Sequence, residues 1–415
     1  MKMKKLLAIS TLLILVFGCQ DKYTESFTAN VPIYMSFEDW RALDIELDAP
    51  RELSDPGKIY IYEEFLFVVD LGTGVHILDN SNPSAPQNLG FIEIFGATDV
   101  AVRNDVLYVD SYVDLVTFDI SNPAVPELLC RLENAFDSNN LPILSGYDAS
   151  LPIVNLNSAS GVIVGWKQEK ITRDADAFVV NQLDSESFSS SSPGNSIGIG
   201  GSMAQFTIVS EYLYVLRSGS ITSFDLSGQN CAETGTEVSI NWNAETIFPY
   251  DNHLFVGTTT GMIIFDLANP AAPNHVGSIE HMTACDPVVV QDNRAYVTIR
   301  SGNTCFGVIN QLDVIDVTNY SQPSIIESYD LTNPHGLGID GETLFICDGN
   351  DGLKVFNAEN DLTIDENMLA HYQDIEAYDV IPFDNVLIMS AREGIYQYDY
   401  TDPQNIAQLS FLPVN

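Results

Sequence analysis

Hydrophobic positions along the chain fall into short runs that end at an acidic turn, and this pattern recurs at a nearly constant interval. Seven runs have the form of a strand closed by Asp or Asn: residues 75–79 (VHILD), 115–119 (LVTFD), 221–225 (ITSFD), 262–266 (MIIFD), 312–316 (LDVID), 353–357 (LKVFN) and 395–399 (IYQYD). Their closing residues lie 40, 106, 41, 50, 41 and 42 positions apart. A repeat of this length indicates one supersecondary unit stacked many times.

Each unit is predicted to contain four short strands. In the second unit they cover residues 98–102, 106–112, 115–121 and 126–133, which are rich in Val, Ile, Leu, Tyr and Phe and are bounded by turn-forming residues. The Asp that closes each third strand is expected to form the turn rather than to catalyse. An Asp or Asn side chain can accept a hydrogen bond from the backbone N–H two residues further on, and the prolines that follow fix the turn.

Four-stranded units at this period are typical of β-propeller blades, whereas a solenoid would need a shorter repeat and capping units. The sequence therefore predicts an all-β propeller of seven four-stranded blades over residues 57–415. A degenerate eighth blade would fit between Asn134 and Gly201, where residues 161–171 have the composition of a strand. Residues 19–56 are expected to form a tether and a lead-in segment outside the propeller.

The N-terminus predicts export. Three lysines among the first five residues precede an apolar run at residues 6–17, which is typical of a secretory signal peptide ending at residue 18 and is too short to span a membrane. Residues 16–19 (VFGC) resemble the lipobox of bacterial lipoproteins, in which the cysteine is acylated and becomes the mature N-terminus. We therefore expect an exported lipoprotein anchored to the bilayer through Cys19, in the outer membrane and facing the periplasm or the surface. The alternative is a plain secreted protein.

Charge and cysteine content restrict the partners. With 17 Lys+Arg against 57 Asp+Glu the net charge is −40, which excludes nucleic-acid binding and leaves the acyl group as the expected membrane contact. No metal or cofactor is predicted, because there is no CxxC pair, the histidines are scattered, and residues 348–352 (DGNDG) lack the remaining ligands of a calcium loop. Two states of the cysteines are consistent with the sequence: a disulfide between Cys285 and Cys305, or buried free thiols.

The seven motif copies, together with longer stretches, resemble the LVIVD-repeat proteins of bacteria. Further stretches that look like this family are residues 57–70, 76–86, 106–116, 200–209, 285–290, 295–303 and 334–340. The resemblance covers nearly all of the chain after residue 30 and implies a β-propeller and an exported lipoprotein. It implies no particular reaction. Asn357 departs from the closing Asp of the motif.

A candidate site is expected at one mouth of the central channel. In a propeller the first strand of each blade lines the channel, and the connections from fourth to first strands share a face with those from second to third strands. Lengthened connections at residues 133–146 and 300–311 fall on this face, which favours binding there. The residues expected at this mouth are Asp99, Asp286, His335 and Asp379, which begin first strands, and Arg300 and Arg392, which end second strands.

Two functions are consistent with such a cluster. It could hold a cation or a polar ligand, or perform acid–base chemistry; alternatively, the side chains satisfy backbone groups and one another around a water-filled channel. We favour a tethered binding or scaffold module for a protein, glycan or surface polymer on the loop-rich face. The alternative is a propeller enzyme, either a hydrolase or a lyase. It is less favoured because the cluster lacks a diagnostic catalytic spacing.

Overall fold

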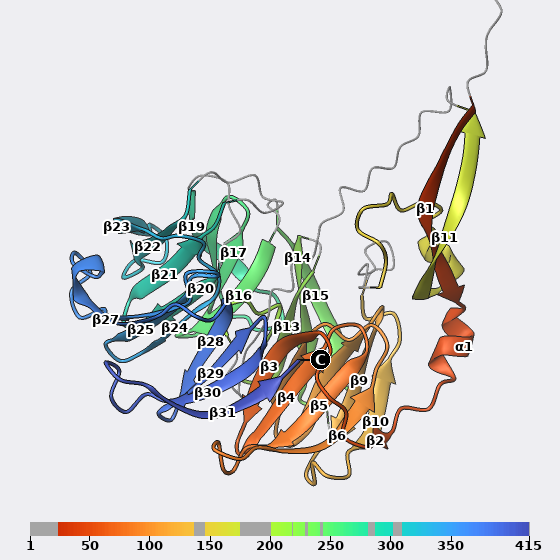
Figure 1. Ribbon diagram of the computed structural model, residues 1–415, viewed down its shortest axis with the longest axis horizontal. Coiled ribbons are helices and arrows are strands. Elements are labelled where there is room, and N and C mark those ends of the chain that lie inside the picture. The colour runs from red at the N-terminus through yellow and green to blue at the C-terminus, as the bar shows by residue number, and fades with distance from the viewer. Residues whose placement is uncertain are drawn as a thin grey trace, which may run out of the picture.

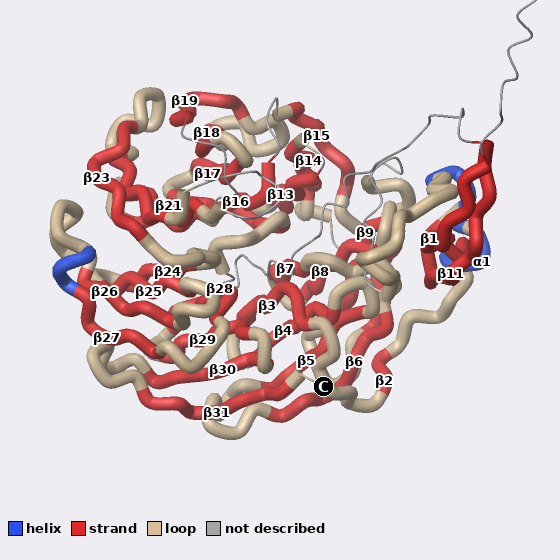
Figure 2. The backbone as a smooth tube through the Cα atoms, turned by 45° about the horizontal axis from the view of Figure 1, so that its top comes forward, coloured by secondary structure: helices blue, strands red, loops and turns tan. Residues whose placement is uncertain are grey.

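Seven antiparallel blades of four consecutive strands form a ring in the computed structural model, which describes residues 24–136, 146–174, 201–217, 219–228, 231–240, 244–280, 287–301 and 309–414 (Figures 1 and 2). In the first blade the short strand β2 (Leu47–Asp48) adds a fifth, outer strand to the sheet. The four strands of each blade follow one another in the chain, and first strands of successive blades contact each other around the centre. This arrangement confirms the predicted seven-bladed propeller.

The blades are numbered I to VII in chain order, and their strands agree closely with the sequence pattern. Blades I and II contain β3 (Pro56–Tyr62), β4 (Phe65–Asp70), β5 (Gly74–Asp79), β6 (Gln87–Glu93), β7 (Val100–Arg103), β8 (Val106–Ser111), β9 (Asp114–Asp119) and β10 (Glu127–Leu132). Blades III and IV contain β12 (Phe206–Val209), β13 (Tyr212–Arg217), β14 (Ser220–Asp225), β15 (Glu233–Ser239), β16 (Ala244–Tyr250), β17 (His253–Thr258), β18 (Gly261–Asp266) and β19 (Asn274–Glu280).

The second half of the ring repeats the same unit. Blades V and VI contain β20 (Val288–Gln291), β21 (Arg294–Ile299), β22 (Gln311–Asp316), β23 (Ser324–Asp330), β24 (Leu337–Asp340), β25 (Thr343–Cys347), β26 (Leu353–Asn357) and β27 (Met368–Tyr372). Blade VII contains β28 (Ala377–Phe383), β29 (Val386–Ala391), β30 (Gly394–Asp399) and β31 (Ala407–Pro413).

The motif residue that closes each third strand forms a turn, as predicted. In all seven blades its side chain accepts a hydrogen bond of 2.6 to 2.9 Å from the backbone N–H two residues further on. Asn357 makes the same bond to Glu359 as the aspartates make elsewhere, so the departure from the motif keeps the turn. Each blade also has a register shift between its third and fourth strands, which is the geometry of a β-bulge.

Apolar side chains fill the spaces between neighbouring blades and close the ring. Ile59 and Leu66 of blade I pack with Ile388 and Ile395 of blade VII in one buried cluster. Two polar links join the same pair of blades: a parallel bridge between Leu53 and Val414, and reciprocal side-chain hydrogen bonds between Asn80 and Gln397. The two ends of the propeller therefore meet without exchanging a strand.

We call the face with the fourth-to-first and second-to-third connections the connection face, and the opposite one, with the Asp-closed turns, the turn face. Beside blade II, on the connection face, β1 (Thr24–Met35) pairs antiparallel with β11 (Val162–Asp174) in a ribbon that extends away from the ring (Figure 1). Residues 24–35, which belong to the expected tether and lead-in segment, thus form a strand. The described residues between blades II and III supply β11 to this ribbon and form no eighth blade, so that alternative is wrong.

A short helix, α1 (Phe37–Arg41), fixes the base of the ribbon to blade II. The ring of Trp40 packs edge-on against Tyr112, with their centroids 5.9 Å apart, in the turn between β8 and β9. Arg41 holds the buried Asp114 in a bidentate ion pair of 2.9 and 2.7 Å, and Arg131 reaches the same carboxylate at 3.1 Å. Among the described helices none is long and apolar enough to cross a membrane.

A disulfide between Cys130 and Cys231 joins the outer parts of blades II and III, with 5.5 Å between the Cα atoms. The sequence did not predict this pair. Cys285, Cys305 and Cys19 lie outside the described residues, and Cys347 is a buried free thiol at the end of β25.

Candidate functional site

The axis of the ring is occupied by the plug segment, residues 201–205, which leads into β12. The Ser202 hydroxyl donates to Asp379 of blade VII (3.1 Å) and accepts from the Leu337 N–H of blade VI (2.8 Å). The Met203 carbonyl accepts from Lys58 of blade I (2.6 Å), and the Ala204 carbonyl from the Ile247 N–H of blade IV (2.7 Å). One short segment thus contacts blades I, IV, VI and VII across the axis of the ring.

Three charged side chains are buried around the plug segment. Lys58 lies on β3 and is flanked by Asp99, just before β7, and by Asp379 on β28. Burial lowers the pKa of Lys58, while the charges of Asp99 and Asp379 oppose that shift. Burial also raises the pKa of Asp99 to about 6 and that of Asp379 well above its usual range. Because a buried charge is costly without partners, the three side chains stabilise one another.

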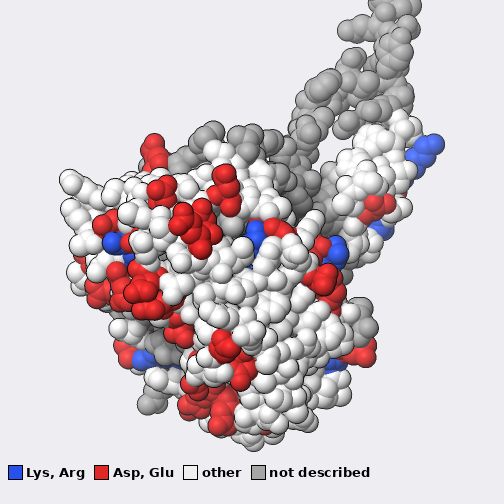
Figure 3. Space-filling view, turned by 60° about the vertical axis from the view of Figure 1, so that its left-hand side comes forward, with Lys and Arg blue, Asp and Glu red and all other residues white. Residues whose placement is uncertain are grey.

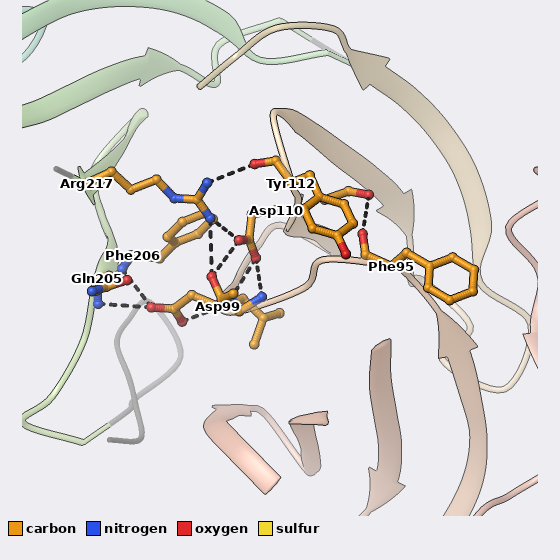
Figure 4. A network of polar contacts seen from close by, with 10 residues as sticks. Phe95, Asp99, Asp110, Tyr112, Gln205, Phe206 and Arg217 are labelled. Carbon is orange, nitrogen blue, oxygen red and sulfur yellow. Dashed lines mark hydrogen bonds and ion pairs between the residues drawn. The ribbon is translucent and has the colours of Figure 1, made fainter. Parts of the chain in front are cut away.

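Both carboxylate oxygens of Asp99 accept hydrogen bonds from backbone N–H groups. Its Oδ2 accepts from the N–H groups of Gln205 (2.9 Å) and Phe206 (3.0 Å), and its Oδ1 from that of Val100 (2.8 Å). This bonding ties blade II to the end of the plug segment and to the first strand of blade III, as Figure 4 shows.

Asp110, at the end of β8, extends the same network. It accepts from the N–H groups of Thr98 (2.7 Å) and Asp99 (2.9 Å) and forms an ion pair with Arg217 of blade III (Figure 4). Arg217 also donates to the Tyr112 carbonyl at 2.9 Å. These carboxylates therefore have a structural role between blades II and III, the alternative considered from the sequence.

Above the plug segment, at the mouth, Arg300 and His335 lie against each other. Arg300 Nη1 is 3.0 Å from Nδ1 and 2.9 Å from Nε2 of His335. Burial, and then the charge of Arg300, lower the pKa of His335 to about 3, so its imidazole is neutral and can accept a hydrogen bond. Burial also lowers the pKa of Arg300, which the nearby Glu245 and Tyr378 oppose.

The mouth continues onto blade VII through two residues that the sequence did not predict. The ring of Tyr378 lies 5.3 Å from that of His335, and its hydroxyl donates to Glu376 at 3.2 Å. Glu376 pairs in turn with Arg392, whose side chain is 65% exposed. We call Arg300, His335, Tyr378, Glu376 and Arg392 the mouth cluster. It offers neutral and cationic donors, an aromatic ring and one carboxylate on a partly open surface.

The predicted site residues therefore divide into two sets. Arg300, His335 and Arg392 belong to the mouth cluster, whereas Asp99 and Asp379 lie below it around the plug segment. Asp286 lies outside the described residues.

In the DGNDG loop the carboxylates are paired with a lysine side chain. Lys354 Nζ lies 2.5 Å from Asp348 and 2.7 Å from Asp351, which are the carboxylates that a calcium ion would need. Among the described residues, no group of three or more His, Cys, Asp or Glu side chains is arranged to hold a metal ion.

Comparison with known families identifies the repeat. The LVIVD repeat matches residues 55–91, 96–133, 243–281 and 284–331, which correspond to blades I, II, IV and V. The chain is an LVIVD-repeat protein. Each matched range coincides with one blade, and blades III, VI and VII have the same four strands and the same closing turn outside the matched ranges.

Solved structures resemble this LVIVD-repeat protein in fold alone. A protein from Lactobacillus plantarum aligns with a TM-score of 0.52 and 10% identity over 86% of this chain and 97% of that one. The computationally designed Ika8 protein aligns with a TM-score of 0.50 and 9% identity over 89% and 92% of the two chains. No curated protein matches the chain in sequence.

Lys58 and the plug segment are the main residues of the site that the sequence reasoning missed. A lysine inside the apolar strand GKIYIY is a signal, since a lysine is seldom fully buried unless it is paired. Gly201 is another: a Cβ atom built there would collide with Asp379 Oδ2, so the plug segment needs glycine to pass this carboxylate.

Proposed function

We propose that this LVIVD-repeat protein is a membrane-tethered binding module that holds a protein or glycan partner at the mouth cluster. The observation that carries the proposal is the position of this cluster. Donors from Arg300, His335, Tyr378 and Arg392 gather near the plug segment, on the face that also bears the lengthened connections. Binding residues are concentrated on loops that a rigid scaffold positions.

An enzyme receives less support from the same geometry. Asp99 has a pKa in a range suited to proton transfer, but both of its oxygens accept backbone N–H bonds beneath the plug segment. A general acid or base must reach the proton that it transfers, within hydrogen-bond distance of a bound substrate. Asp99 is therefore unavailable as the general acid or base of a hydrolase or lyase.

The tether in this proposal rests on the sequence of residues 1–19. Acylation of Cys19 would anchor the protein with roughly 0.8 kcal/mol per buried methylene group. A Cys19→Ala protein should be recovered in the soluble fraction, and mass spectrometry of the membrane-extracted parent should find an acylated Cys19 as the first residue. An intact Met1 or an unmodified Cys19 in membranes would contradict the tether.

A pull-down from native membranes tests the binding role with a matched pair of variants. Arg392→Ala removes an Arg–Glu pair from the mouth cluster, and Arg103→Ala removes the Arg103–Glu211 pair from the turn face. A partner retained by the parent and by Arg103→Ala, but lost by Arg392→Ala and by Tyr378→Ala, is the expected result. Equal recovery with all four proteins would place binding elsewhere, and no recovery with any would contradict the role.

A further inference from the structure

The ribbon of β1 and β11 is attached to the propeller as a firm extension. Besides the packing of Trp40 on Tyr112, the Tyr112 hydroxyl donates to the Ile163 carbonyl of β11, and Met35, Val162 and Val164 belong to the same cluster at the ribbon's base. Asp114 is completely buried beneath Arg41 and Arg131, so the Arg41–Asp114 ion pair is largely shielded from solvent and salt.

The direction of the ribbon is set by its base. That base lies on the turn between β8 and β9, which belongs to the connection face, and β1 runs from Thr24 at the far tip to Met35 at the base. Twelve residues of strand span about 40 Å, which agrees with the long projection visible in Figure 1. Cys19 precedes Thr24 by five residues, which can extend at most about 18 Å beyond the tip.

Charge is distributed unequally between the two faces. Of the 13 Lys and Arg residues after residue 23, only Arg103 and Arg294 lie at the turn face, each beside a first-to-second turn. The turn face also bears carboxylates on the closing turns and on the first-to-second turns: Asp79, Asp119, Asp225, Asp266, Asp316, Asp399, Glu63, Glu64, Asp105, Glu211, Asp251, Asp292, Glu342 and Asp384. The predominance of acidic groups over basic ones is visible on the side of the ring that Figure 3 presents.

We infer that the ribbon is a rigid stalk that orients the propeller, with the connection face and its mouth cluster turned toward the lipid bilayer and the acidic turn face turned away. This inference rests on the proposed anchoring at Cys19. The stalk directs the connection face toward the anchor, and repulsion between the turn face and anionic headgroups favours the same orientation. A partner bound at the mouth is then an exposed part of a membrane protein that extends from the bilayer by about the length of the stalk.

Energy transfer from the acylated protein to vesicles tests the orientation. Gln373→Cys on the connection face and Gln404→Cys on the turn face of blade VII each carry a donor dye. Both positions are exposed, and a blade separates them by about 20 Å, so transfer to a headgroup-linked acceptor should be about threefold stronger from Gln373→Cys than from Gln404→Cys. The vesicles contain phosphatidylethanolamine and phosphatidylglycerol, and the parent protein supplies the background labelling of native thiols.

Vesicle flotation distinguishes a failure of the tether from a failure of the orientation. If the acylated protein does not float with the vesicles, the tether fails and the orientation fails with it. If it floats but transfer from Gln404→Cys equals or exceeds that from Gln373→Cys, the orientation is overturned while the tether stands. Arg41→Ala, which weakens the base of the stalk, should bring the ratio of the two signals toward one; an unchanged ratio would show that α1 does not fix the stalk.

Discussion

Lys58 Nζ donates to the carbonyl oxygen of Met203 at 2.6 Å, which joins two residues 145 positions apart at the centre of the ring. The lysine belongs to blade I and the carbonyl to the plug segment, and the carboxylates of Asp99 and Asp379 lie on either side. A propeller whose ends exchange no strand thus has a polar connection along its axis in addition to the apolar packing between blades.

Replacement of Lys58 should destabilise the whole ring. Lys58→Met leaves two buried carboxylates and a carbonyl without their cation, and breaking a buried charge pair in this way costs about 3 to 5 kcal/mol. Urea unfolding measures the loss, with Lys170→Met on the exposed part of β11 as the control, for which a change within about 0.5 kcal/mol is expected. A loss below about 1 kcal/mol in Lys58→Met would contradict the central role of this lysine.

Stability should depend on the protonation of Asp99. Its pKa rises from 3.8 to about 6 on folding, so the folded state binds the proton more tightly and this contribution is fully present below pH 4. It is lost as the pH rises through 6, and its size is on the order of 3 kcal/mol. The advantage of the parent over Asp99→Asn in free energy of unfolding should therefore grow between pH 7 and pH 4. Asp330→Asn, at an exposed position, is the control, and parallel pH curves for parent and Asp99→Asn would refute the assignment.

The plug segment should not tolerate a side chain at Gly201. A methyl group there collides with Asp379 Oδ2, a buried oxygen without a hydrogen-bond partner, and overpacking of this kind costs about 1 to 3 kcal/mol. In Gly165→Ala on β11 the added atom lies 3.8 Å from its nearest neighbour, so that variant should unfold like the parent. Thermal unfolding of the two proteins distinguishes them, and equal transitions would mean that the plug segment can move aside.

Oxidation state should control the stability of blades II and III. The Cys130–Cys231 disulfide closes a loop of 101 residues, and reduction of a link of this length costs about 4 to 5 kcal/mol. Non-reducing peptide mass analysis should recover the linked pair, and unfolding with and without reductant should give the difference. Free thiols at both positions in the protein purified without reductant would contradict the pairing.

Most of the fold could be predicted from the sequence because its signals are local. The closing Asp, the turn that follows it and the alternation of strand and turn lie within a few residues of one another, and they are repeated seven times. Residues 134–201 carried no such repetition. The strand composition of residues 161–171 was correct, but its partner is β1, more than 120 residues away, and a single strand cannot reveal a partner at that separation.

The site could be predicted only in part, for a related reason. The start of a first strand and the end of a second strand lie at the same mouth, which is why His335 and Arg300 were expected together and are together. Whether such a residue faces an opening or supports a neighbour depends on what fills the axis. Here residues 201–205 fill it, and their course is fixed by contacts with blades I, IV, VI and VII rather than by their own sequence.

The docking of α1 on blade II also determines how the protein would respond to mechanical load. Tension applied through an anchored N-terminus enters β1, where it is opposed by the full antiparallel register from Thr24–Asp174 to Met35–Val162. It then reaches the shielded ion pair of Arg41 with Asp114 before it can reach the lead-in to blade I. The seam between blades I and VII, held by the Leu53–Val414 bridge and the Asn80–Gln397 pair, lies beyond this point. Blade II bears the force, and the seam of the ring is spared.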